Sequence, residues 1–321
     1  MQATKKYTIK EKIKFYWQLI KPFKHLTMIV PFILGTSIAL WELGYLKKQL
    51  FFLSFLILFF GVASVYIQNE IADYETDKHN ISETTGGTKL LVSGKVSILE
   101  ATILMIIFGA IALILGLFLV IKYHYPIWFY ILCLIFFTIA YGYSGWPFMF
   151  SYRGLGEITL TITNAFAPTF VFYYIQTKHF SILPFVVALP YAIAVFAQKV
   201  LREFPDYKPD KLAGKENLVV KFGPEKMSKV YRFCLMLFIV SIILVDLILI
   251  IFYKLNPLLF ILTFYPIYVA YKFLKITKRK NTFYKDYEFL KPLTIKGFKL
   301  MFDTALIYSL IFVLDRVLSG K

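Results

Sequence analysis

Long apolar stretches separated by shorter polar ones dominate the pattern of this 321-residue chain. A helix needs roughly twenty apolar residues to cross a bilayer. By that measure nine stretches are candidate spans, of which the fourth and the eighth are the shortest. They are residues 19–41, 50–71, 96–121, 127–143, 158–175, 180–200, 233–253, 258–274 and 300–318. The pattern therefore predicts an all-α integral membrane protein with nine transmembrane helices.

Composition supports a fold that is embedded in lipid. The chain is 59% hydrophobic and only 17% charged, and its mean hydropathy is +0.66. A soluble domain of this length has no interior large enough for so much apolar surface, so lipid is the expected solvent. The net charge of +17 comes largely from lysines beside the apolar stretches, where they set topology and meet anionic lipid, which argues against nucleic-acid binding. Four scattered histidines and two isolated cysteines, Cys133 and Cys234, form no zinc, haem or disulfide pattern.

The charge distribution predicts which connections face the cytoplasm. If the basic segment 1–18 is cytoplasmic, four connections return to that side: 77–95, 143–157, 202–232 and 272–299. The last two are strongly basic, whereas the opposite connections 122–126 and 254–257 carry few charges, as the positive-inside rule requires. We therefore expect a multi-pass protein of the cell (inner) membrane, with residues 1–321 forming a single membrane domain.

Polar residues close two of the apolar stretches at a regular spacing of four. Asn69, Asp73 and Asp77 follow the second stretch, and Asp206 and Asp210 follow the sixth. Residues four apart on a helix lie on one side, so each set projects toward one place. Both sets lie on the predicted cytoplasmic face. In one interpretation they belong to two copies of a duplicated four-helix unit, which would bring the four aspartates together if the copies faced each other.

Carboxylates at this spacing suit a divalent cation. Mg²⁺ prefers carboxylate oxygens, and one or two carboxylates often hold it together with the phosphates of a substrate. Asp73, Asp77, Asp206 and Asp210 are therefore candidate metal ligands and catalytic residues, and Asn69 is a candidate diphosphate ligand. An apolar interior behind such a site fits a diphosphate head with a long hydrocarbon tail, which describes a polyprenyl diphosphate. Mg²⁺ would offset charge on the departing diphosphate, and exclusion of water would protect the allylic cation.

Each acidic set is followed by a loop with glycine and lysine, at 85–89 and 213–215, whose backbone and charge suit an anion. Five further side chains are candidates for contact with the diphosphate or the cation: Lys21, Lys89, Lys199, Arg202 and Tyr143. Each also has an ordinary structural interpretation. Lysines at membrane boundaries snorkel or set topology, tyrosines there pack against lipid, and Arg202 could pair with Asp206 one turn away.

These motifs resemble the signatures of the UbiA superfamily of membrane prenyltransferases. Residues 69–77, Asn-Glu-Ile-Ala-Asp-Tyr-Glu-Thr-Asp, are similar to its N-D/E-x-x-D-x-x-x-D signature. Residues 206–215, Asp-Tyr-Lys-Pro-Asp-Lys-Leu-Ala-Gly-Lys, are similar to its D-x-x-x-D-x-x-A-G-K signature. Weaker similarities are Leu-Ile-Lys-Pro at 19–22 and Tyr-Arg-Gly-Leu-Gly-Glu at 152–157. Arg202 departs from the family, in which many members have asparagine at that place.

The resemblance implies nine helices arranged in a ring and Mg²⁺-dependent transfer of a prenyl group from its diphosphate to a lipophilic, usually aromatic acceptor. It gives metal and diphosphate roles to five motif residues: Asn69, Asp73, Asp77, Asp206 and Asp210. Lys89 lies where relatives place a basic diphosphate ligand. The segments 86–94 and 152–157 are similar to those of dihydroxynaphthoate polyprenyltransferases of menaquinone synthesis. Glyceryl phosphate lipids, haem and chlorophyll-type acceptors are the alternatives.

A transporter is the rival from another class, because acidic residues within apolar helices can mark an ion path. Asp246 and Asp303 are the residues that favour it. A transporter is expected to hold its charges near the middle of the membrane, whereas the aspartates of the two motifs lie at the ends of apolar stretches. The sequence therefore favours the prenyltransferase.

Overall fold

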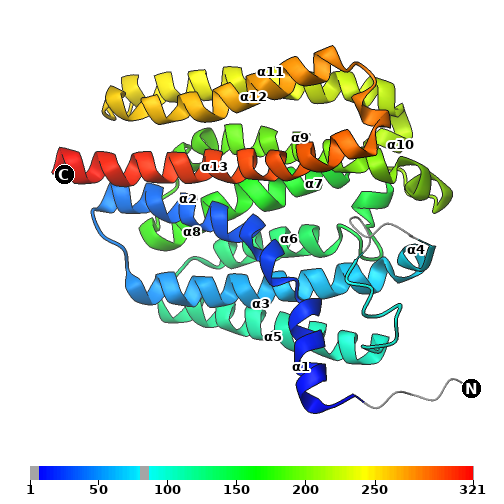
Figure 1. Ribbon diagram of the computed structural model, residues 1–321. Helices are drawn as coiled ribbons and strands as arrows, with labels where there is room; N and C mark the ends of the chain where they lie inside the picture. Colours follow the sequence, from blue (N-terminus) through cyan, green and yellow to red (C-terminus); the bar gives the residue numbers. More distant parts are fainter. Residues whose placement is uncertain (1–6, 80–86, 321) are drawn as a thin grey trace, which may run out of the picture. The chain divides into compact units, whose positions relative to one another are not determined.

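The chain folds into helices and connecting turns, without strands, throughout the residues that the computed structural model describes, 7–79 and 87–320 (Figure 1). It forms two compact units. The first unit contains Met1–Leu26 and Phe55–Met149, and the second contains Thr27–Ser54 and Phe150–Lys321. Helix α3 (Lys48–Ala72) begins in the second unit and continues in the first.

Eight helical segments of the described residues are long and apolar enough to cross a membrane, and the shorter apolar helix α6 adds a ninth candidate. They follow the nine predicted stretches in order, which confirms the all-α membrane class. The segments are α1 with α2 (Ile9–Leu19, Leu26–Leu43), α3, α5 (Ile98–Lys122), α6 (Ile127–Tyr141), α7 with η3 and α8 (Gly156–Thr161, Ile162–Phe166, Ala167–Thr177), α9 (Leu183–Leu212), α11 (Pro224–Ile251), η4 with α12 (Pro257–Thr263, Phe264–Arg279) and α13 (Tyr287–Ser319).

The connection predicted at 202–232 is largely helical, which corrects the sequence interpretation. Helix α9 continues to Leu212, α10 (Leu218–Phe222) follows, and α11 begins at Pro224. Likewise, the connection predicted at 272–299 shrinks to the few residues between α12 and α13. Hydropathy marks only the part of a helix that lies in lipid, whereas backbone hydrogen bonding carries the helix beyond it.

The amino-terminal segment forms a helix of its own in the first unit. Thr8 and Glu11 form a capping box that starts α1, and α1 stops before Lys21, whose left-handed φ of 53° precedes Pro22. Lys12 of α1 pairs with Glu100 at the start of α5 at 2.8 Å. Helix α1 therefore runs across the direction of α3 and α5 (Figure 1).

Helix α9 is the centre of the second unit, where it packs against α11 and α13. Buried tyrosines and phenylalanines fill this core, among them Tyr191, Tyr231, Tyr308 and Phe312. Helices α2 and α8 approach closely at Gly35, because a Cβ there would collide with the carbonyl oxygen of Thr169.

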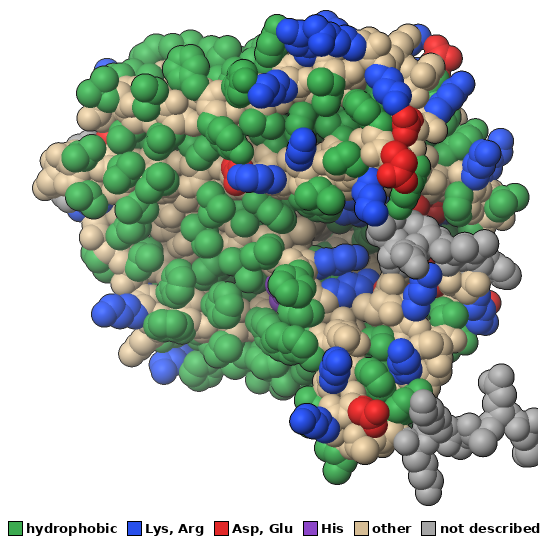
Figure 2. All heavy atoms as spheres, in the orientation of Figure 1, with side chains coloured by type: hydrophobic (Ala, Val, Ile, Leu, Met, Phe, Trp, Pro, Cys, Tyr) green, Lys and Arg blue, Asp and Glu red, His purple; other side chains and the backbone are tan. Residues whose placement is uncertain are grey.

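Several outward side chains are apolar, as expected for helices in lipid. Helix α5 exposes Ile103, Ile107, Ile114 and Phe118. Figure 2 shows apolar side chains over much of the visible face, with Lys and Arg side chains scattered among them. This pattern agrees with a bilayer around the helices.

Candidate active site

The first acidic motif keeps its helical spacing although α3 ends at Ala72 and α4 (Tyr74–His79) begins after it. The Asp73 N–H donates to the Asn69 carbonyl at 2.9 Å, and the Asp77 N–H donates to the Asp73 carbonyl at 2.8 Å. These bonds continue the helical pattern across the break. Successive residues among Asn69, Asp73 and Asp77 are therefore separated by about one helical turn.

The Asn69 side chain presents an oxygen that suits a hard cation or an N–H group. Its Oδ1 atom is buried, and it accepts no hydrogen bond from the described residues. A buried polar oxygen without a donor is uncommon in native proteins and needs an explanation, such as a bound ion. Amide and carboxylate oxygens are the ligands that Mg²⁺ takes, so Asn69 and the two aspartates fit this ion.

Asp77 is joined to the loop that follows the motif. Its Oδ2 accepts a hydrogen bond from the Gly87 N–H at 3.2 Å. Burial raises the pKa of Asp77 to about 6; the Gly87 bond lowers it, and the negative charges of Asp73 and Glu70 raise it. A bound cation would favour the charged carboxylate and oppose the effect of burial. The site thus has local negative charge that a divalent cation would stabilise.

Glu70 holds the same loop from the other side, a role that the sequence interpretation missed. Its buried carboxylate accepts hydrogen bonds from the Thr88 N–H at 2.9 Å and the Thr88 hydroxyl at 2.7 Å. Lys21, a candidate for the diphosphate, forms an ion pair with Glu70. Lys89 follows Thr88 in the left-handed region, with a φ of 56°. The signal for Glu70 was present, since it is the acidic second residue of the first motif.

The second motif lies within one helix. Asp206 and Asp210 are one turn apart near the end of α9, which closes before Gly214 at a φ of 69°. Asp210 Oδ2 accepts a hydrogen bond from the Asn217 amide at 2.7 Å. Lys215 Nζ lies 4.0 Å from Asp210 Oδ1. Lys215 belongs to the glycine–lysine loop that the sequence analysis singled out, whereas Asn217 is a further residue beside this motif to which the sequence interpretation gave no role.

The basic candidates of α9 have partners inside the second unit. Lys199 is buried and pairs with Glu203 at 2.6 Å. The Arg202 guanidinium carbon lies 5.4 Å from the centre of the Phe298 ring, a cation–π contact with α13. The ion pairs of the described residues do not include one between Arg202 and Asp206. Tyr143, in the first unit, lies half-buried just after α6.

Each motif supplies two aspartates at helical spacing. Among the described residues, no three His, Cys, Asp or Glu side chains gather closely enough to hold a metal ion by themselves. Mg²⁺ commonly takes only one or two carboxylates and completes its shell with water and substrate phosphates. The pairs therefore fit an ion that arrives together with a phosphorylated substrate.

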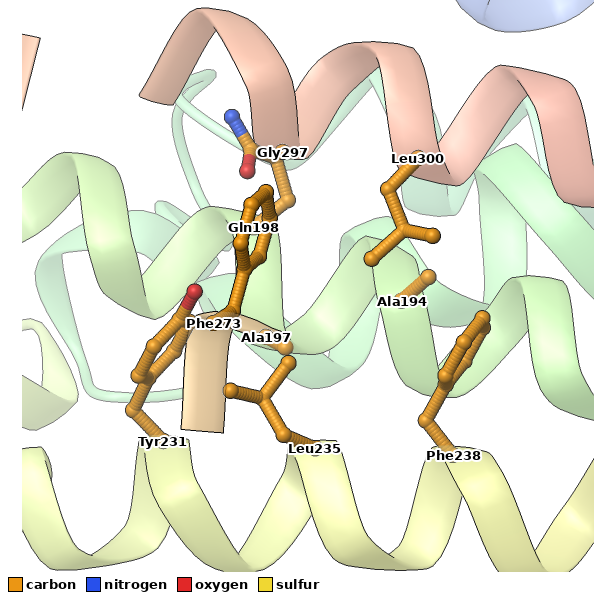
Figure 3. Close-up of a pocket in the computed structure, with 9 residues that line it drawn as sticks. All are labelled: Ala194, Ala197, Gln198, Tyr231, Leu235, Phe238, Phe273, Gly297 and Leu300. Atoms are coloured by element: carbon orange, nitrogen blue, oxygen red, sulfur yellow. The ribbon is translucent and has the colours of Figure 1, made fainter. Parts of the chain in front are cut away.

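Helices α9, α11, α12 and α13 line a small, partly open pocket of about 20 Å³ (Figure 3). It lies beside Gln198, whose side-chain N–H donates to the Thr294 carbonyl at 2.9 Å, and against Gly297. A cavity of this size holds about one water molecule. It is too small for a prenyl chain and is not the substrate pocket.

The two acids that favoured a transporter have local partners. Asp246 accepts hydrogen bonds from the hydroxyls of Thr263 at 2.7 Å and Tyr308 at 2.8 Å. Asp303 pairs with Lys299 one turn earlier on the same helix at 2.5 Å. Both acids are thus bound to neighbouring side chains within the second unit, which weakens the argument for an ion path.

The long apolar helices are those of a polytopic membrane protein. The oxygen-rich motifs at the ends of two of these helices suit a metal ion and a phosphorylated substrate. The profile of the UbiA prenyltransferase family matches residues 28–289. The chain belongs to this family, as its motifs suggested.

Two curated relatives are similar to the chain at low identity. One is the 1,4-dihydroxy-2-naphthoate octaprenyltransferase of Bacillus subtilis, 26% identical over 64% of this chain and 65% of the relative. The other is the 2-carboxy-1,4-naphthoquinone phytyltransferase of Synechocystis, 26% identical over 68% of this chain and 69% of the relative. The match thus spans slightly less than two thirds of the Bacillus enzyme.

Solved structures share the fold. A digeranylgeranylglyceryl phosphate synthase has a TM-score of 0.68 and 20% identity, and the match covers 94% of this chain and 99% of that one. A UbiA homolog from Archaeoglobus fulgidus bound to GPP and Mg²⁺ has a TM-score of 0.64 and 18% identity, over 92% and 99% of the two chains. At these identities the likeness concerns the fold alone.

Proposed function

We propose that this protein transfers a prenyl group from a polyprenyl diphosphate to a lipophilic aromatic acceptor, and that the acceptor is a naphthoate of quinone synthesis. The observation that carries the proposal is the first motif, where the Asn69 oxygen is buried without a donor among the described residues and two aspartates follow at helical spacing. The names of the two curated relatives favour the naphthoate class.

Mg²⁺ is the cofactor that these residues fit. In the first unit Asp73 and Asp77 would be its ligands, with Asn69 contributing its amide oxygen to the ion or its substrate, and in the second unit Asp206 and Asp210 would be its ligands. When bound, the ion supplies positive charge that stabilises the departing diphosphate. The related Archaeoglobus protein was crystallised with Mg²⁺ and GPP, which agrees with this choice.

The basic residues would bind the diphosphate before and after it leaves. Lys89 and Arg202 are the proposed direct contacts, Lys89 from its loop beside Thr88 and Arg202 from α9. Lys21 and Lys199 stay in the proposal, but each also neutralises a buried glutamate. In this proposal the positive charge of each lysine stabilises its glutamate partner and also attracts the diphosphate.

The reaction breaks the carbon–oxygen bond of the prenyl diphosphate, and the bonding electrons leave with the diphosphate. The allylic cation is then attacked by an electron-rich carbon of the acceptor, which loses a proton to restore its aromatic ring. Water must stay out, because it would capture the cation. We place the Tyr143 ring near the cation, where its face would stabilise positive charge.

We further propose that the protein lies in the cell (inner) membrane with this site facing the cytoplasm. The basic connections predicted for that side support the orientation. A water-soluble diphosphate head would then enter from the cytoplasm, while its hydrocarbon tail and the acceptor remain in lipid.

Product analysis of purified protein tests the proposal. The assay contains Mg²⁺, labelled prenyl diphosphates and a panel of acceptors: dihydroxynaphthoate, hydroxybenzoate, homogentisate, a glyceryl phosphate lipid and haem. A prenylated dihydroxynaphthoate is expected. A product with the glyceryl phosphate lipid alone would keep the reaction and change the acceptor, and folded protein that neither binds diphosphate nor yields product would overturn the function.

A further inference from the structure

The loop that follows Asp210 is docked on the turn Tyr152–Glu157, a segment that the proposed reaction leaves without a role. The Glu216 N–H donates to the Tyr152 carbonyl at 3.2 Å. The Leu218 N–H donates to Glu157 Oε1 at 2.8 Å. Gly154 makes room, since its φ is 72° and a Cβ there would lie 3.2 Å from the Glu216 carbonyl oxygen. The turn thus receives the backbone of this loop at two points.

Glu157 is anchored in the interior of the second unit. Its side chain is 0% exposed, and its second oxygen, Oε2, accepts no hydrogen bond from the described residues. Glu203 of α9 is buried in the same unit, and it pairs with the buried Lys199 at 2.6 Å.

Asn217 connects the docked loop to the acidic motif. The residue is 1% exposed, and its two side-chain atoms have separate partners. Its Oδ1 accepts from the Val220 N–H at 2.9 Å, which caps α10. Its amide N–H donates to Asp210 Oδ2 at 2.7 Å. By holding one carboxylate oxygen of Asp210, this bond sets the direction in which the other oxygen points.

We propose that Glu157 and Asn217 are positioning residues that fix the Asp210 carboxylate for its cation, through the loop 213–218 docked on the turn Tyr152–Glu157. The inference rests on the proposed function, in which Asp210 is a metal ligand. Hydrogen-bond partners behind metal ligands commonly contribute about 10- to 100-fold to metal affinity or activity. Glu157 acts through the Leu218 backbone, and Asn217 acts directly on the carboxylate.

Asn217→Ser separates positioning from capping. Serine caps helices about as well as asparagine, but its shorter side chain does not reach from the cap to Asp210. Binding of the non-hydrolysable analogue geranyl thiodiphosphate is measured by calorimetry across a Mg²⁺ series, together with turnover. We expect the Mg²⁺ concentration for half-maximal binding to rise about tenfold, with the thermal midpoint unchanged.

Asn256→Ser is the matched control. Asn256 also caps a helix, accepting from the Leu258 N–H at 3.0 Å at the start of η4, and its side chain has no bond to an acidic motif. The Mg²⁺ series of this variant should coincide with that of the unaltered protein. An equal shift in both variants would show that loss of a cap is enough, and would overturn the positioning role of Asn217.

Glu157 is tested by rescue. In Glu157→Gln the side-chain oxygen still accepts the hydrogen bond from the Leu218 N–H, so the loop keeps this contact. This variant should retain most of the Mg²⁺-dependent binding, whereas Glu157→Leu should lose about tenfold in Mg²⁺ affinity. Equal behaviour of the two variants would contradict the role of Glu157.

Asp210→Ala in the same series separates this inference from the proposed function. If Asp210→Ala abolishes Mg²⁺-dependent binding while Asn217→Ser matches the unaltered protein, the positioning role falls and the metal role stands. If Asp210→Ala binds normally, the metal role of Asp210 falls, and the positioning inference falls with it.

Discussion

At the scale of single residues, the two motifs place charge where a divalent cation would be needed to balance it. Burial is the largest cause that raises the pKa of Asp77. The negative charges of the nearby Asp73 and Glu70 raise it further. Lys21 pairs with Glu70, and although its charge also lowers the pKa of Asp77, it does not outweigh the effects that raise that pKa. Direct ligands are therefore expected to be more sensitive to substitution than their neighbours.

Asp73→Ala and Asp206→Ala should each lower turnover by more than about 100-fold, because removal of a ligand exceeds the usual cost of removing a partner behind it. Diphosphate release with saturating prenyl diphosphate and Mg²⁺ is the measurement. Glu75→Ala is the control, since Glu75 lies between the two aspartates of the first motif but is exposed and pairs with the neighbouring Lys78. Normal turnover in either aspartate variant would remove it from the site.

Gly87→Ala should reduce kcat/KM by roughly ten- to a hundredfold, the cost of displacing a positioned group by about 1 Å. A Cβ at Gly87 would collide with the carboxylates of Glu70 and Asp77, so the loop or the motif must shift. Gly61→Ala serves for comparison, because its Cβ would meet its nearest neighbour at an ordinary 3.7 Å. If both alanine variants react alike, the Gly87 contact is unimportant for the reaction.

At the scale of elements, α1 has the features of a helix that lies in the membrane interface. Its exposed apolar residues recur every four positions, with Ile9 83%, Ile13 62% and Trp17 54% exposed. Lys12 and Tyr16, on the stripe beside these residues, bind Glu100 of α5. A basic helix with one apolar stripe, held across neighbouring spans, suits a surface of anionic lipid.

Trp17 should therefore be quenched by brominated lipids in vesicles that contain anionic lipid. The readout is the difference in fluorescence quenching between the unaltered protein and Trp17→Phe, which isolates one of the four tryptophans of the chain. We expect quenching to be stronger with bromines near the headgroup than deep in the acyl chain. Equal quenching of both proteins at every depth would place Trp17 away from lipid.

At the scale of the whole molecule, lipid made the fold easy to predict. Each span must satisfy its own backbone and present apolar side chains, so local hydropathy identifies it. The first motif was equally predictable, because helical spacing of Asn69, Asp73 and Asp77 is a local property. Contacts between distant residues gave no such signal: the pairing of Glu70 with Lys21 and of Asp210 with Asn217 appears only in three dimensions.

The orientation of the whole chain can be tested by labelling single cysteines in intact cells with a membrane-impermeant maleimide. Lys78→Cys and Lys285→Cys lie in connections predicted to be cytoplasmic, whereas Lys122→Cys and Lys254→Cys lie in connections predicted to face the other side. All four positions are exposed. The positive-inside rule predicts labelling of the second pair in intact cells and of the first pair only after permeabilisation. The native Cys133 and Cys234 lie within apolar helices and should react weakly. Labelling of Lys78→Cys and Lys285→Cys on different sides would contradict the predicted topology, in which all four cytoplasmic connections lie on one face, and would remove the basis for placing the two acidic motifs on that face.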